Sequence, residues 1–299
     1  MAVSPAASAT FIINPIAGGG TVGAAEGNAR LALSIAEGFS VPSEVFVTTH
    51  VGHARELAKA AAGRGTRVVM AWGGDGTINE VASALVGSDV ALGIVPAGSG
   101  NGLARELGIV PRPRQAIADA LHARPRSIDV GELEGRYFVN TAGIGFDAHI
   151  ASRFATARRR GFLGYVGITA HALTSYVPRH YRVSVAGGAP QRVRAVLLTI
   201  ANSAQFGNGA IIAPGARVDD GELDLVIFEE RSRFRTVCAL PRLFNGTADR
   251  ISGCRITRLR EVVVDADAPL TFHVDGEPVA GGTTLRARVH PGALCVAVN

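Results

Sequence analysis

The first third of the chain alternates short apolar runs with longer segments in which apolar residues recur at helical spacing. The short runs predict β-strands at residues 10–14, 44–48, 66–72 and 90–95. The longer segments predict helices at residues 22–38, 53–62, 77–86, 100–107 and 114–122. Strands that alternate with helices in this way are typical of a parallel sheet covered by helices.

From residue 127 the pattern changes to short alternating apolar segments separated by Gly, Pro and Asp. These segments predict strands at residues 127–133, 137–142, 181–185, 194–201, 223–228, 262–265, 270–274 and 294–298. Short strands with turn residues between them favour an antiparallel sandwich or barrel. Two predicted helical insertions, at residues 163–176 and 235–245, interrupt the series.

The change of pattern divides the chain into two predicted domains, since 299 residues exceed what one hydrophobic core serves comfortably. Residues 1–124 are expected to form an α/β domain with a parallel sheet. Residues 125–299 are expected to form a β-sandwich domain with helical insertions. A cleft between two such domains is the default place for a ligand.

Composition narrows the class of protein. An apolar share of 47% with 18% charged residues favours a globular protein and argues against disorder or a coiled coil. The net charge of +5 comes almost entirely from Arg, because Lys59 is the only lysine. Arg suits phosphates and anionic head groups, although a bias towards Arg in the coding sequence explains the excess equally well.

Cysteine usage and hydropathy indicate the compartment. Cys238, Cys254 and Cys295 lack metal-type spacing and are odd in number, which argues against a disulfide framework and fits a reducing cytosol. No stretch reaches the roughly 18 to 20 apolar residues of a spanning helix, and the N-terminus does not have the pattern of a secretory signal. Any membrane contact is therefore expected to be peripheral.

The motif Gly73-Gly74-Asp75-Gly76-Thr77 lies between a predicted strand and a predicted helix. Glycines there let backbone amides approach phosphate oxygens, and a helix N-terminus favours anions. A carboxylate would repel phosphates unless a metal ion or a proton intervened, so Asp75 is expected to face Mg²⁺ or the hydroxyl that receives the phosphoryl group. The alternative is a tight turn in which Asp75 and Thr77 cap the helix.

Two further Gly-rich segments follow predicted strands in the first domain. Residues 18–23 satisfy G-x-G-x-x-G, and Glu44 lies where a ribose-binding acid is expected, so a dinucleotide fold competes. Residues 96–102 follow the fourth strand. All three segments are expected at the carboxyl edge of one sheet, where ligands bind in open α/β folds. The sequence has no G-x-x-x-x-G-K-[ST], which excludes a P-loop NTPase.

Together these motifs resemble the catalytic domain shared by diacylglycerol kinases, sphingosine and ceramide kinases and their bacterial relatives. The resemblance covers nearly the whole chain, and its motifs are Asn14-Pro15 with Gly18, Gly73 to Thr77 with Asn79-Glu80, Pro96 to Asn101, Asp129, residues 143–147, residues 202–224 and Asp275-Gly276-Glu277. The GGDGT motif alone also resembles NAD kinases and phosphofructokinases. Gly102 departs from many bacterial relatives, which have an acidic residue there.

The resemblance implies an ATP-dependent lipid kinase with a nucleotide-binding α/β domain, similar to phosphofructokinases and NAD kinases, and a β-rich lipid-binding domain. The acceptor it implies is diacylglycerol or a sphingoid or ceramide-like lipid, and the cofactors are ATP and Mg²⁺. The residues it implies for ATP are Asn14, Pro15, Gly18, Thr48, Gly73, Gly74, Asp75, Gly76, Thr77, Asn79, Glu80, Gly98, Ser99, Gly100 and Asn101.

The same resemblance implies a structural Mg²⁺ held by Asp220 and by the backbone carbonyls of Arg217 and Glu222, although residues 219–221 alone read as a hairpin turn. It makes Glu277 the general base on the lipid hydroxyl, with Asp275, Asp75 and Asp129 in a Mg²⁺ and water network. An ordinary turn is the alternative for Asp275-Gly276-Glu277.

Basic residues interleaved with aromatics predict transient contact with an anionic membrane surface, at the inner face. They are Arg153, Phe154, Arg158, Arg159, Arg160 and Phe162, and a second group at residues 231–235. A solvated helix face is the alternative for each group.

No nucleic-acid partner is expected, because the sequence has no recognised nucleic-acid motif. A homodimer is compatible with the sequence. A kinase acting on NAD and a non-catalytic nucleotide- or lipid-binding regulator are the competing functions.

Overall fold

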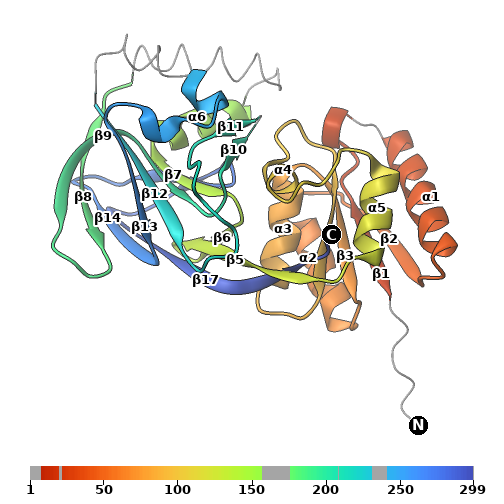
Figure 1. Cartoon of the computed structure of the whole chain (residues 1–299). Helices are drawn as coiled ribbons and strands as arrows, with labels where there is room; N and C mark the ends of the chain where they lie inside the picture. The colour runs from red at the N-terminus through yellow and green to blue at the C-terminus, as the bar shows by residue number, and fades with distance from the viewer. Residues whose placement is uncertain (1–7, 20–21, 157–175, 208, 231–240, 299) are drawn as a thin grey trace. The chain divides into compact units, whose positions relative to one another are not determined.

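The computed structural model describes residues 8–19, 22–156, 176–207, 209–230 and 241–298 (Figure 1). The chain divides into two compact units, Met1–Ile128 with Gly292–Asn299, and Asp129–Pro291. The last residues of the chain therefore belong to the first unit, whereas the sequence pattern placed everything after residue 124 in the second domain. Pattern alone did not reveal this return, because a strand looks the same whichever sheet it joins.

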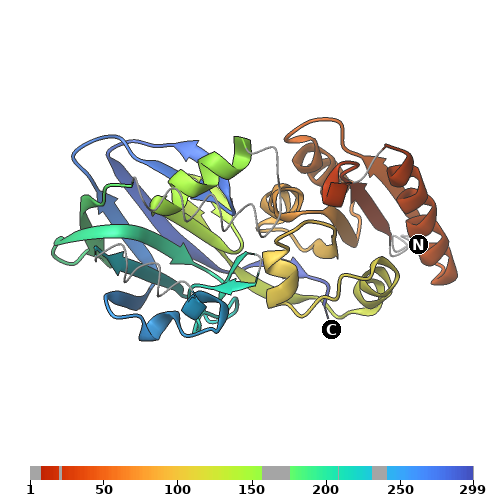
Figure 2. The same cartoon turned by 90° about the horizontal axis from the view of Figure 1, so that it is seen from above.

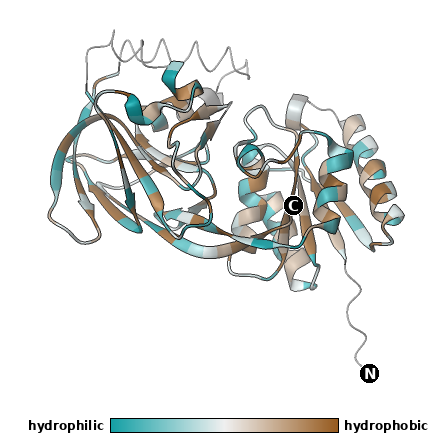
Figure 3. Ribbon diagram, viewed as in Figure 1, coloured by the Kyte–Doolittle hydropathy of each residue, from teal (hydrophilic) through white to brown (hydrophobic). Residues whose placement is uncertain are grey.

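The first unit is built on a parallel sheet with the strand order β2-β1-β3-β4, and the end of β17 lies beside β4. Its strands are β1 (Ala9–Ile13), β2 (Ser43–Val47), β3 (Val68–Gly73), β4 (Ala91–Pro96) and the end of β17 (Thr284–Val296). Every residue of β1, β3 and β4 is buried, as expected for strands covered on both faces. Figure 3 shows this as hydrophobic colour on the central strands.

Helices cover both faces of the parallel sheet (Figures 1 and 2). Helix α1 packs beside α5, and α2 packs beside α3. The helices of this unit are α1 (Val22–Gly38), α2 (His53–Gly63), α3 (Asp75–Leu85), α4 (Gly102–Glu106) and α5 (Pro113–His122). Small alanines of α1 and α2 are buried against the strands, which lets these helices lie close to the sheet.

The second unit is built from antiparallel strand pairs, and its strands enclose an apolar core that includes Phe138, Tyr181, Leu198 and Phe272. Strand β9 is central, because its first half pairs with β8 and its second half lies between β7 and β12. The strands not yet given are β5 (Arg126–Leu133), β6 (Arg136–Phe138), β7 (Thr141–Gly145), β8 (Arg179–Val185), β9 (Gln191–Ala201), β10 (Gln205–Gly207), β11 (Ala210–Ile211), β12 (Leu223–Glu229), β13 (Cys254–Leu259), β14 (Glu261–Asp265), β15 (Thr271–Val274) and β16 (Glu277–Ala280).

Several elements differ from the prediction. The strand expected at residues 137–142 is two strands, β6 and β7, and a helix that the pattern did not predict, α6 (Phe146–Thr156), follows them. Strands β13 and β16 were also missed, because both are short and largely exposed and lack a clear apolar alternation.

Residues 20–21 of the Gly-rich segment 18–23 and residue 208 of the motif at residues 202–224 lie outside the described residues, and so do parts or all of four other predicted segments. They are residues 163–175 and 235–240 of the two helical insertions, Arg158, Arg159, Arg160 and Phe162 of the first basic group, and the basic group at residues 231–235. In the part of the chain that is described, no helix is long and apolar enough to span a bilayer.

The return of the C-terminal end to the first unit generates a prediction. Leu294 is fully buried, and Ala293 accepts a hydrogen bond from the Gly87 amide. Replacing Leu294 by Ala should lower the free energy of unfolding of the first unit by about 2–5 kcal/mol. Urea unfolding followed by the fluorescence of Trp72, the only tryptophan and a core residue of this unit, measures the change.

The matched control is Val51→Ala, because Val51 is 86% exposed, and its effect should stay within about 0.5 kcal/mol. Equal stabilities of Leu294→Ala and the wild type would show that the C-terminal end does not belong to this core.

Candidate active site

Three glycine-rich loops meet at the carboxyl ends of β1, β3 and β4. A Cβ atom added to Gly98 would lie 2.7 Å from the Cα of Gly74, and one added to Gly18 would lie 2.6 Å from the carbonyl oxygen of Ala97. Gly18 also has a φ of 66°, which other residues rarely adopt. Backbone therefore touches backbone at these positions, and any side chain would separate the loops.

Hydrogen bonds join the same loops. Asn14 Nδ2 donates to Thr77 Oγ1 at 2.9 Å, which links the end of β1 to the GGDGT loop. Asn14 Oδ1 accepts the Ile16 amide at 3.1 Å, and the Ala97 amide donates to the carbonyl of Gly73 at 2.9 Å. Asn14 thus holds its own loop and its neighbour in one arrangement.

Asp75 binds the loop after β4. Its two carboxylate oxygens accept the amides of Asn101 at 2.9 Å and of Gly102 at 2.6 Å, at the start of α4. Asn101 closes the same loop, since its side chain bonds both the amide and the carbonyl of Gly98 at 2.8 Å. The sequence analysis expected Asp75 to face Mg²⁺ or a hydroxyl. The structure shows it capping α4, because helix-terminal amides need an acceptor.

Glu80 has a similar capping role at another helix. Its carboxylate accepts the amides of Gly52 at 2.9 Å and of Ala54 at 3.1 Å, where α2 begins. Asn79 is buried, and its Oδ1 accepts the hydroxyl of Ser83 at 3.3 Å. Both side chains were predicted to contact ATP, and in this structure both are engaged by protein groups.

Other predicted residues are open to a ligand. Gly18, Gly76 and Ser99 are exposed, and the space around the Gly76 Cα is empty. Pro15 and Thr48 are half-buried at the same edge of the sheet. The exposed positions offer mainly backbone amides, which suit phosphate oxygens.

A histidine pair that the sequence analysis did not single out lies beyond β2. His50 and His53 stack with ring centroids 4.7 Å apart and planes within 7°. The Thr49 amide donates to His53 Nδ1 at 3.1 Å, two residues past the end of β2. Two histidines three residues apart between a strand and a helix were the available signal.

In the second unit, Asp275 and Gly276 form the turn between β15 and β16. Their φ values of 46° and 85° meet the requirement of a type I′ hairpin. The Asp275 carboxylate accepts three amides, those of Val139 at 2.9 Å, Asn140 at 2.9 Å and Thr141 at 3.0 Å. It can point at this segment because Asp275 is a turn residue with a φ of 46° and does not follow the alternation of the strands beside it.

Glu277 is the first residue of β16 and is exposed. Among the described residues its carboxylate has no hydrogen bond or ion pair. Of the four acids predicted to be catalytic, it is therefore the one whose oxygens are free to meet a substrate. Asp75, Asp129 and Asp275 all accept backbone amides.

Asp129 holds the predicted metal loop in place. It is buried on β5, its Oδ2 accepts the Gly221 amide at 2.7 Å, and its own amide donates to the Val218 carbonyl at 2.6 Å. Asp220 Oδ1 accepts the Glu222 amide at 3.1 Å. This loop therefore keeps one arrangement because a buried carboxylate binds its backbone.

Negative charge gathers around this loop. Burial raises the pKa of Asp224, Arg258 lowers it, and the nearby carboxylates of Asp220 and Glu222 raise it again, so that the net pKa is above its usual range. The Arg217 side chain turns to Asp219 at 3.1 Å, which leaves only its backbone as a cation ligand. Within the described residues, no three His, Cys, Asp or Glu side chains form a metal-binding group.

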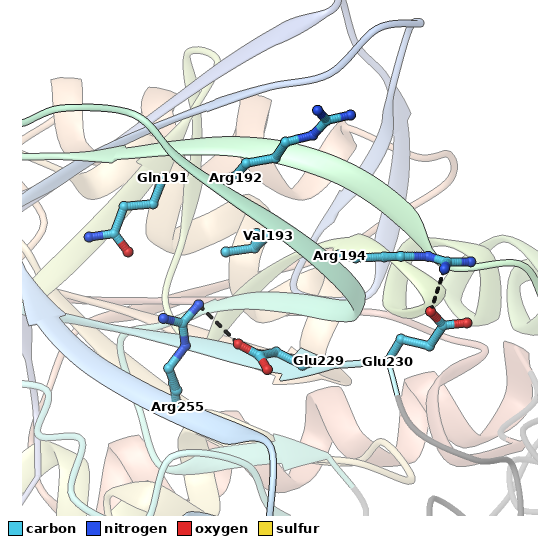
Figure 4. Close-up of a pocket in the computed structure, with 7 residues that line it drawn as sticks. All are labelled: Gln191, Arg192, Val193, Arg194, Glu229, Glu230 and Arg255. Carbon is cyan, nitrogen blue, oxygen red and sulfur yellow. Dashed lines mark ion pairs between the residues drawn. The ribbon is translucent and has the colours of Figure 1, made fainter.

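A separate pocket of about 400 Å³ lies at the start of β9 in the second unit (Figure 4). Its charges are largely paired, with Arg194 2.8 Å from Glu230 and Arg255 3.3 Å from Glu229. None of the predicted site residues lines it, so it is not part of the candidate site.

Comparison with known proteins identifies the family. Residues 8–133 match the diacylglycerol kinase catalytic domain, and residues 140–298 match the YegS C-terminal NAD kinase beta sandwich-like domain. The chain is 34% identical over 263 residues to a Chromohalobacter salexigens protein named "Probable lipid kinase YegS-like", covering 85% of this chain and 83% of that protein. It belongs to the diacylglycerol kinase and YegS family of lipid kinases.

Further relatives support the same assignment. This lipid kinase is 30% identical over 276 residues to a Mycobacterium tuberculosis protein named "Diacylglycerol kinase", covering 90% of this chain and 88% of that protein. Two solved structures from Bacillus anthracis str. Sterne share its fold. One has a TM-score of 0.80 at 19% identity and covers 99% of both chains. The other has a TM-score of 0.74 at 17% identity and covers 99% of this chain and 98% of its own.

The comparisons confirm the family and the fold class predicted from the sequence. This lipid kinase is a phosphotransferase with an α/β first part and a β-sandwich-like second part. Membership of a kinase family implies ATP use. The individual residue roles stay predictions.

The close approach of the glycine loops generates a prediction. Gly98→Ala should lower the free energy of unfolding of the first unit by about 1–3 kcal/mol, because the new Cβ would be forced against the Gly74 backbone. Trp72 fluorescence during urea unfolding measures it. The control is Gly27→Ala in helix α1, because a Cβ atom added there would have no atom within 4 Å. The free energy of unfolding of this variant should rise by roughly 0.5–1 kcal/mol. A Gly98→Ala variant as stable as the wild type would contradict the contact.

Proposed function

We propose that this lipid kinase transfers the γ-phosphoryl group of ATP to the hydroxyl of a lipid, either diacylglycerol or a sphingoid or ceramide-like lipid. The observation that carries the proposal is the meeting of three glycine loops at the carboxyl edge of the parallel sheet. Backbone meets backbone where Gly98 faces Gly74 and where Gly18 faces the Ala97 carbonyl, and the exposed backbone of Gly18, Gly76 and Ser99 beside these contacts suits phosphate oxygens. The first unit binds ATP, and the second provides the carboxylate for the acceptor.

The capped helices support ATP binding indirectly. The carboxylates of Asp75 and Glu80 accept backbone amides at the starts of α4 and α2. These hydrogen bonds fix the loops that follow β4 and β2. Gly18, Gly76 and Ser99 then face the nucleotide. A fixed set of donors costs no reorganisation when charge develops on the transferred group, which is how such sites lower a barrier.

Glu277 acts as the general base. Its carboxylate takes the proton of the lipid hydroxyl while that oxygen forms a bond to the γ-phosphorus, and the bond from the γ-phosphorus to the bridging oxygen of ADP breaks. Asp275 positions Glu277, since its three amide bonds fix the turn that precedes β16. A positioned base accelerates such a step by about 10²- to 10⁴-fold.

The loop at residues 217–222 fits a hard divalent cation. The backbone carbonyls of Arg217 and Glu222 and the carboxylate of Asp220 provide oxygen ligands, which Mg²⁺ prefers. Burial is the main cause of the raised pKa of Asp224, but the carboxylates of Asp220 and Glu222 add to it, and the negative charge that these residues bring together fits a cation as well. Bound Mg²⁺ would neutralise this charge, and Asp129 would hold the loop from below. A second Mg²⁺ accompanies ATP and balances phosphate charge when bound.

The acceptor is drawn from a bilayer in this proposal, through transient contact with an anionic membrane surface at its cytoplasmic face. The support is the sequence alone, where Arg153 and residues 158–160 and 231–235 place basic charge beside aromatics.

Transfer of labelled phosphate tests the proposed reaction. With labelled ATP, Mg²⁺ and fractionated lipid, the wild type should label a lipid. Glu277→Gln should lower kcat by about 10²- to 10⁴-fold with the fold intact. Asp75→Ala should abolish the signal by releasing the start of α4. Glu261→Gln, an exposed acid of the same unit, is the control and should keep wild-type kcat.

The acceptor arm of the same assay distinguishes the competing functions. Label in NADP without lipid dependence would favour a kinase acting on NAD, an alternative kept open by the NAD kinase-like C-terminal domain match. ATP binding without turnover on any lipid would favour a regulator. Wild-type kcat in Glu277→Gln would exclude this residue as the base.

Thermal unfolding with and without Mg²⁺, in the absence of nucleotide, tests the metal loop. Mg²⁺ at one hundred times its Kd should stabilise the second unit by about 2.7 kcal/mol, seen as a rise in Tm. Asp220→Asn should lose most of this rise, whereas the neighbouring Asp219→Asn, whose carboxylate binds Arg217, should keep it. An equal Mg²⁺ response in Asp220→Asn and the wild type would refute the assignment.

A further inference from the structure

Three residues on adjacent strands form a row next to the turn that precedes Glu277. His273 on β15 lies directly opposite Gly143 on β7, which lies directly opposite Thr199 on β9. Asp147, in the first turn of α6, fills the space above Gly143. A Cβ atom at Gly143 would overlap both the Asp147 carboxylate and the His273 ring. The glycine is therefore required for these two side chains to meet.

Asp147 joins the two outer members of the row. Its Oδ2 lies 2.8 Å from His273 Nε2 and accepts the Thr199 hydroxyl at 3.0 Å. His273 is 3% exposed, Asp147 5% and Thr199 0%. An ionisable pair so deeply buried is expensive to desolvate, and apolar residues of similar volume often serve a core equally well or better. Packing alone does not explain its presence.

The second nitrogen of His273 reaches the turn itself. The Gly276 amide donates to His273 Nδ1 at 3.2 Å. Because an N–H group donates to it, Nδ1 carries a lone pair, so the proton of the neutral ring is on Nε2, 2.8 Å from Asp147 Oδ2. Hydrogen bonds thus run from Thr199 into Asp147 and from Gly276 into His273, whereas His273 Nε2 lies at ion-pair distance from Asp147 without the alignment of a hydrogen bond.

We infer that His273 is a positioning residue for phosphoryl transfer: its Nδ1 fixes the Gly276 amide in the turn that presents Glu277, and Asp147 selects the ring tautomer that can do so. The inference rests on the proposed function, in which Glu277 is the base. Asp275 fixes one side of the turn through residues 139–141, and His273 fixes the other. Misplacement of a catalytic group by about 1 Å costs about 10²-fold in rate.

Two isosteric variants separate the two contacts of the His273 ring, that of Nδ1 with Gly276 and that of Nε2 with Asp147. In His273→Asn, the oxygen of the side-chain amide takes the place of Nδ1. The hydrogen bond from the Gly276 amide is then kept, and the contact with Asp147 is lost. In His273→Gln, the nitrogen of the side-chain amide takes the place of Nε2. The contact with Asp147 is then kept, and the hydrogen bond from the Gly276 amide is lost. Both variants replace a buried ring and lose one of its two contacts. If the role of His273 were purely structural, kcat would fall alike in both.

The kinetic experiment compares kcat for lipid phosphorylation and KM for ATP in the wild type and both variants. His273→Gln should lower kcat by about 10²-fold with an unchanged KM for ATP. His273→Asn should keep kcat within about 3-fold of the wild type, since a retained hydrogen bond leaves the turn in place. Urea unfolding should show similar stabilities for the two variants.

A spectroscopic experiment tests the tautomer without reference to activity. Burial, the largest effect, lowers the pKa of His273, but the carboxylates of Asp147 and Asp275 together raise it more, so the net pKa is above its usual range. Ring ¹⁵N NMR is therefore recorded at a pH where the ring is neutral, and His273 is assigned among the 8 histidines by its absence from the His273→Asn spectrum. The expected result is a proton on Nε2 and none on Nδ1. Kinetics are measured at the same pH.

The outcomes are distinguishable. A neutral ring with its proton on Nδ1 would overturn the inference, and so would equal losses of kcat in the two variants of an active enzyme. Both results would leave the proposed function standing. A wild type that phosphorylates no lipid would overturn the proposed function and this inference together.

Discussion

The contact of backbone with backbone at Gly18, Gly74 and Gly98 is the constraint on which the first unit's site depends. A Cβ atom at any of these positions would enter the space of the facing loop. The absence of side chains lets the loops that follow three parallel strands meet backbone to backbone, and in the proposed function their amides act on one anion. Asn14 and Asp75 then lock the loops by hydrogen bonds across them. The surrounding helices and sheet hold this contact in place.

Buried and half-buried carboxylates that accept backbone amides recur in both units. Asp75 and Glu80 cap helices of the first unit, whereas Asp129 and Asp275 hold the metal loop and the hairpin turn of the second. Such charge-assisted bonds are stronger than neutral ones, so they can fix irregular backbone that no regular ladder supports. Of the four acids predicted to be catalytic, Glu277 is the exposed one whose oxygens face no described protein group. In the proposed mechanism the carboxylates that hold backbone position the site, and Glu277 reacts.

Local periodicity explains what the sequence could predict. The buried strands β1, β3 and β4 appear as short apolar runs, and α1 begins and ends where its pattern does, at Val22 and Gly38. The loops between them could be located because glycines follow each strand. The partners of Asp75 and Asp275 could not, because they come from segments distant along the chain. Likewise, nothing in the pattern of residues 292–299 indicates which sheet they join, and the helical character of α6 is masked by the glycines that precede it.

The most direct test of the central claim follows the wild-type backbone amides by NMR during titration with a non-hydrolysable ATP analogue and Mg²⁺. The account predicts that the largest shifts occur in the three loops, at Gly18, at Gly74 and Gly76, and at Gly98 and Ser99, and that they saturate together with one Kd. Amides of these loops that stay unmoved while the analogue binds, or saturating shifts confined to other parts of the chain, would contradict it.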